Sequence, residues 1–249
     1  MAQQFRFEDL FKEIKSAEET MDPFLQPTAT EVFADLRRQL ETIRSRPFGE
    51  KARWEIAKTR PLFTRLSEGL YEPKGRKGKH KVIGEITSVW EIMPSDPKAN
   101  NRTLARTFAL CGLTSVRVRL LEGSTSGQVL GEWRMEIASD GAPGCFFHIQ
   151  VLGEDGRNVP PFPHSLSIPR LPSLAFTPMT ALEFVVGELF QESWREHAVQ
   201  ETNAMNFWRS IQEKRLMALL DWYQQVIKST GGSPWNALKA AVPQEGLFL

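Results

Sequence analysis

The sequence of 249 residues contains little cysteine, no long apolar run and almost no net charge. Its two cysteines, Cys111 and Cys145, are too few for a disulfide framework and fit a reducing compartment. No run of roughly 18 apolar residues occurs, so we expect no membrane partner and no membrane span. Because 31 Lys and Arg residues balance 30 Asp and Glu residues, overall charge gives no reason to expect nucleic acid. The charged N-terminus lacks the apolar stretch of a secretion signal, so we expect a cytoplasmic protein.

Motifs of the common nucleotide-binding and hydrolytic sites are missing as well. Neither the P-loop pattern nor G-x-G-x-x-G occurs, and the sequence contains no G-x-S-x-G and no H-E-x-x-H. Cys145 and His148 lie three residues apart, which on a strand directs the two side chains to opposite faces and argues against zinc. We therefore expect no cofactor and no metal site.

The apolar pattern predicts an α+β protein that forms a single domain over residues 1–249. Residues 82–152 alternate apolar and polar side chains, which predicts an antiparallel meander of consecutive strands. Helical spacing predicts a helical region on each side of this sheet, at 1–72 and at 178–230. Residues 153–177 are rich in proline and predict a loop. We expect N-terminal helices, a central antiparallel sheet and two long C-terminal helices packed on it.

Residues that can cap a helix predict where helices begin within the two helical regions. Thr28 or Thr30 can cap the N-terminus of a second helix. Thr177 followed by proline is a good start for a C-terminal helix. A third, weaker helical stretch carries Trp54 and Ile56.

Polar side chains occupy alternate positions of three successive predicted strands and form a candidate site. If these strands are neighbours, the side chains gather on one face of the sheet. We expect the following ligand-binding residues, the last two coming from the proline-rich loop: Arg117, Arg119, Arg134, Glu136, Gln150, His164 and Arg170. His148 is the candidate catalytic acid or base, and the arginines would bind anionic groups. A solvated sheet face gives the same alternation without any function.

A basic loop separates the N-terminal helical region from the predicted sheet. Its glycines and its proline argue against a packed element. The cations of this loop can contact phosphates of a nucleic acid, although a solvated connector is the simpler interpretation. They are Lys74, Arg76, Lys77, Lys79 and Lys81.

Three segments resemble a family of uncharacterised prokaryotic proteins, some of which are encoded near phage-defence genes. The segments are FFHIQV at 146–151, IPRLP at 168–172 and FTPMTALEFVVGELF at 176–190. The family offers no activity that can be assigned to individual residues. The resemblance implies a cytoplasmic prokaryotic context with a link to antiviral defence.

These observations leave three functions open. The leading expectation is a non-enzymatic binding or adaptor subunit of a cytoplasmic complex, with another protein as its partner, because no catalytic signature occurs. The second is an enzyme that acts on a phosphorylated or carboxylated small molecule, with His148 as acid or base and arginines as anion clamps. The third is a nucleic-acid-binding module that uses the basic loop at 74–81.

Overall fold

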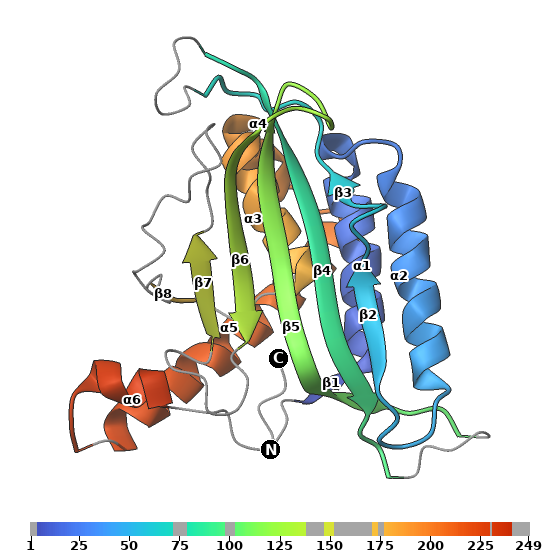
Figure 1. Ribbon diagram of the computed structural model, residues 1–249, viewed down its shortest axis with the longest axis vertical. Helices are drawn as coiled ribbons and strands as arrows, with labels where there is room; N and C mark the ends of the chain where they lie inside the picture. Colours follow the sequence, from blue (N-terminus) through green and yellow to red (C-terminus); the bar gives the residue numbers. More distant parts are fainter. Residues whose placement is uncertain are drawn as a thin grey trace.

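The computed structural model describes residues 4–71, 79–97, 103–137, 147–151, 171–173, 177–229 and 231–240. These residues form an eight-stranded antiparallel sheet with helices against one face (Figure 1). The predicted α+β class is therefore confirmed. No helix in this described part of the chain combines the length and the apolar character that a membrane span requires.

The centre of the sheet is a meander of consecutive strands, as the alternation predicts. These strands are β4 (Val82–Pro94), β5 (Thr107–Glu122), β6 (Val129–Ile137) and β7 (Phe147–Val151). The short strand β8 (Leu171–Pro172) pairs with β7 and lies within the predicted proline-rich loop. The β4–β5 register shifts between Trp90 and Ile92, where the longest pair of strands bends.

The N-terminal helices follow the predicted apolar spacing. Helix α1 (Phe7–Met21) buries one face against the core, and a 3-10 turn (Asp22–Phe24) connects it to α2. Helix α2 (Ala29–Arg44) starts directly after Thr28, one of the two predicted caps. Its buried positions recur every three or four residues, so this helix also turns one apolar face to the sheet.

The chain after α2 forms strands, so the prediction of a third helical stretch around Trp54 and Ile56 is wrong. Strands β2 (Ala52–Ile56) and β3 (Leu62–Phe63) both pair with β4, and β1 (Gln4–Arg6) pairs with β5. Trp54 and Ile56, two residues apart, are completely or almost completely buried. The Trp54 ring meets the Trp90 ring of β4 edge-on at 5.4 Å. Pairing with a distant strand therefore determines the local structure here, rather than helical spacing.

The C-terminal region contains two long helices, as predicted, together with two short ones. They are α3 (Pro178–Leu189), α4 (Gln191–Ala198), α5 (Asn203–Ser229) and α6 (Pro234–Ala240). The Thr177 hydroxyl accepts a hydrogen bond from the Thr180 N–H at 3.1 Å, which confirms the predicted start of α3. Helix α3 packs on β4, whereas α5 packs mainly on α1 and runs past the edge of the sheet toward α6 (Figure 1).

The two faces of the sheet differ in what covers them. The covered face packs against α1, α2 and α3, and there Ile86, Val118 and Phe147 are buried in the core. The open face carries the intervening residues, such as Arg117 and Arg119, and no helix in the described ranges lies on it (Figure 1). Strand alternation thus separates an apolar from a polar surface within one sheet.

Candidate functional site

Strand register brings the predicted polar residues together on the open face. The cross-strand pairs on this face are Glu85 with Arg119, Arg117 with Arg134, Arg119 with Glu132, Glu136 with His148, and Arg134 with Gln150. Residues directly opposite each other in an antiparallel pair are close enough for their side chains to interact. The structure therefore places on one surface all six residues that it describes of the predicted sheet-face site.

Carboxylates on the open face bind two of its arginines. Arg117 donates from Nε and Nη2 to the two oxygens of Glu132, at 2.7 and 2.5 Å. Arg119 donates from Nη1 to Glu85 Oε1 at 2.9 Å. The sequence-based site omitted Glu132, although its position two residues before Arg134 could have identified it. An anionic ligand on this face would have to compete with these two carboxylates.

His148 lies among polar partners but is almost completely buried. It is 1% exposed, and its Nε2 lies 3.7 Å from Glu136 Oε2 and 3.4 Å from Gln150 Nε2. The hydrogen bond from His148 holds the pKa of the Glu136 carboxyl below its usual value, against the opposing effect of burial. In this conformation, a substrate on the open face has almost no access to the imidazole.

Other predicted residues are outside this surface. The described part of the chain does not include His164, Arg170, Lys74, Arg76, Lys77 or Cys145. Lys81 donates from Nζ to the backbone carbonyl oxygens of Ser67, at 2.7 Å, and Glu68, which reduces its availability for phosphates. Lys79 is exposed. Within the described residues, no group of three or more His, Cys, Asp or Glu side chains could hold a metal ion.

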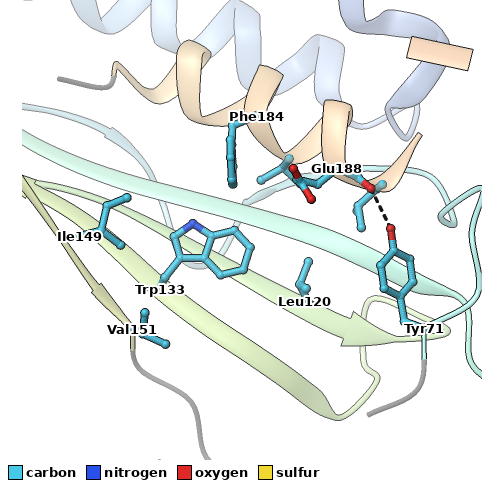
Figure 2. A pocket seen from close by; sticks show the side chains of 9 residues that line it. Tyr71, Leu120, Trp133, Ile149, Val151, Phe184 and Glu188 are labelled. Atoms are coloured by element: carbon cyan, nitrogen blue, oxygen red, sulfur yellow. Dashed lines mark hydrogen bonds between the residues drawn. The ribbon is translucent and has the colours of Figure 1, made fainter. Parts of the chain in front are cut away.

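A pocket of about 380 Å³ opens between α3 and the covered face, at the end of the sheet near β7 (Figure 2). Its lining residues are Tyr71, Leu120, Trp133, Ile149, Val151, Phe184, Val185, Glu188 and Leu189. The rings of Trp133 and Phe184 meet edge-on, with centroids 6.3 Å apart. The lining is apolar apart from the Glu188 carboxylate and the Tyr71 hydroxyl, which is typical of sites for small molecules.

The local structure explains why these side chains meet. Trp133 points to the covered face because it alternates with the polar residues of β6. Phe184 and Glu188 lie four residues apart on α3 and so project from the same side of the helix. Phe184 is 45% exposed and Val151 is 43% exposed, so the core does not fill the mouth of the pocket.

Tyr71 closes one end of the pocket. Its hydroxyl donates a hydrogen bond to the backbone carbonyl oxygen of Glu188 at 2.7 Å (Figure 2). Burial raises the pKa of the Tyr71 hydroxyl, and the nearby negative charge of Glu188 raises it further. The tyrosine therefore stays neutral and anchors the chain after β3 to the last turn of α3.

Sequence reasoning did not identify this pocket. Alternation predicted that Trp133 faces inward, but Tyr71 precedes the basic loop and carried no signal. Phe184 is one of several apolar residues of α3, and only its position relative to the sheet distinguishes it.

Comparisons with known proteins complete the description of the site. No family model, curated protein or solved structure matches this chain. The resemblance of three of its segments to uncharacterised prokaryotic proteins therefore stays a prediction. The geometry of the pocket and of the open face is consequently the evidence for a function.

Proposed function

We propose that this protein is a non-enzymatic binding protein that holds a small apolar molecule in the pocket between α3 and the sheet. The observation that carries this proposal is a preformed cavity with exposed aromatic and aliphatic walls. Its volume of about 380 Å³ falls in the range of small-molecule sites, roughly 300–1,000 Å³. Filling it would remove apolar surface from water, which favours binding.

The open face supports an enzymatic role less well. Arg117 and Arg119 are held by internal carboxylates, so their charge is already balanced. His148 is buried beside Glu136 and has almost no access to solvent. Arginines can bind an anionic ligand only if their interaction with it is stronger than the interaction with the carboxylates that they already contact. The enzymatic and nucleic-acid alternatives stay predictions without added support.

Binding of naphthylmethanol, a neutral aromatic probe, tests the proposal. Ligand-detected NMR should give a dissociation constant on the order of 0.1–1 mM, as expected for so small a ligand. Phe184→Asp should weaken binding by about tenfold or more, because it places a charge at the wall of an apolar site. Phe207→Asp is the matched control, since Phe207 is 58% exposed on α5 and does not line the pocket.

Two outcomes would contradict the proposal. One is that the wild-type protein does not bind the probe. The other is that Phe184→Asp and Phe207→Asp weaken binding equally, which would locate the probe elsewhere.

A role as a subunit of a complex has separate support in the distal half of α5. We define the α5 stripe as Leu216, Leu220 and Ile227, which are 41%, 45% and 40% exposed. Their spacing of four and seven residues places them on one side of the helix. Glu213 and Lys228 lie near opposite ends of this stripe, so antiparallel pairing of two copies would bring unlike charges together. A second copy of this chain is therefore the partner that the stripe fits.

Sedimentation analysis tests this second candidate. The wild-type chain should form dimers at high concentration, and Leu220→Lys should shift it to monomers because it places a charge in the apolar interface. Phe207→Lys, on the opposite side of α5, should leave the dimer intact. A wild-type chain that stays monomeric at every concentration would contradict the candidate.

A further inference from the structure

We propose that the ligand of this pocket is an organic cation, with a positively charged nitrogen attached to an apolar body, and that Glu188 selects it. The inference rests on the proposed function and adds the class of ligand. It follows from the charge at the pocket wall and from the kind of side chains around it.

Glu188 gives the pocket a negative charge that none of the residues described by the structure neutralises. Among the described lining residues it is the single carboxylate. No described cation lies within ion-pair distance of it, in contrast to Glu132 and Glu85 on the open face. Figure 2 shows its side chain on the pocket side of α3, between Phe184 and Tyr71. A cationic group in the pocket would therefore gain an ion pair with Glu188 without displacing any partner among the described residues.

Aromatic rings are the second feature of the pocket that favours a cation. Trp133, Phe184 and Tyr71 come from three separate elements of the chain and all line the same cavity. The face of an aromatic ring attracts a cation, most strongly when the ring is tryptophan. Rings together with one carboxylate form a wall that stabilises an ammonium or a similar group, while the aliphatic residues contact the apolar body.

The same features disfavour an anion. The nine lining residues that the structure describes (Figure 2) include no lysine, arginine or histidine, and Glu188 would repel a carboxylate or phosphate. Tyr71 carries the one hydroxyl among the described lining residues, and this hydroxyl already donates a hydrogen bond to the Glu188 carbonyl oxygen. The pocket thus favours the opposite charge to the anionic small molecule considered from the sequence.

Three probes that share one aromatic body test the inference: naphthylmethylamine, naphthylmethanol and naphthylacetate. At neutral pH the wild-type protein should bind the amine about threefold to tenfold more tightly than the alcohol. The acetate should bind more weakly than either. Glu188→Gln should reduce the affinity for the amine to that for the alcohol. The affinity for the alcohol should stay within about twofold of the wild-type value. Glu41→Gln, which removes an exposed carboxylate from α2, is the matched control and should change neither.

The outcomes separate this inference from the proposed function. If the alcohol and the amine bind equally well, the pocket binds apolar molecules but the cation preference is wrong. A preference for the amine that persists in Glu188→Gln would overturn the assignment of Glu188. If none of the probes binds, the proposed function itself fails and the inference fails with it.

Discussion

Ile86 and Thr87 are neighbours on β4, yet their side chains lie on opposite faces of the sheet. Ile86 packs into the core beneath α3, and Thr87 faces the ladder of charged residues on the open face. On the open face the charged groups bind one another, so little attraction remains for a ligand. On the covered face the helices leave apolar walls uncovered beside α3, and there a ligand can remove surface from water. The more polar surface of the sheet is therefore not the better candidate for the site.

Alanine variants of Ile86 and Thr87 should differ most in their free energy of unfolding. Ile86→Ala should lower the free energy of unfolding by about 2–5 kcal/mol, because it leaves a cavity in the core. Thr87→Ala should lower it by about 1 kcal/mol or less. Urea denaturation followed by circular dichroism measures both values. Equal losses would mean that the open face is packed as tightly as the covered one.

Removal of Glu132 should have an intermediate effect. Glu132→Ala leaves Arg117 without the carboxylate that binds it through two hydrogen bonds, and should cost about 1–2 kcal/mol in unfolding free energy. The control is Glu192→Ala, which breaks an exposed pair with Arg195 and should cost about 0.5 kcal/mol or less. If both variants lose the same small amount of unfolding free energy, the charged side chains of the open face form only a solvated surface.

Glu136 and Glu183 should have small and opposite effects on how the free energy of unfolding depends on pH. The hydrogen bond from His148 lowers the pKa of Glu136, so its favourable contribution is complete above the unfolded-state value of 4.5 and is lost as pH falls through the folded-state pKa. Burial raises the pKa of Glu183 on α3, and the charge of Glu13 on α1 acts in the same direction. The unfavourable contribution of Glu183 is therefore complete above its folded-state pKa and disappears below 4.5.

Unfolding free energies measured across the acid range test these opposite signs. Glu183→Gln should stabilise the protein at neutral pH by up to about 1 kcal/mol, because it removes the cost of a buried charge. Glu136→Gln should instead reduce stability at neutral pH, by less than about 1 kcal/mol since the carboxylate is partly exposed. Shifts of the same sign in both variants would contradict the difference between their environments.

How much the sequence predicts depends on how local each feature is. Alternation along β4 to β7 is local, so the meander and the gathering of arginines with His148 could be predicted. Trp54 and Ile56 form a strand because β2 pairs with β4, a contact between distant segments that short spacing cannot reveal. The pocket depends on where α3 crosses the sheet, which brings Phe184 over Trp133. Such tertiary placement has no signature in either segment alone.

Photolabelling with a naphthyl diazirine, followed by mass spectrometry of the labelled peptides, determines which side of the sheet a ligand occupies. We expect labels on residues of α3 and on the covered face of the sheet, with Phe184, Leu189 and Trp133 as the main positions. Excess naphthylmethanol should suppress these labels because it competes for the same cavity. Labels confined to Arg117, Arg119 and their open-face neighbours would rule out the pocket as the binding site, since the ligand would then occupy the opposite side of the sheet.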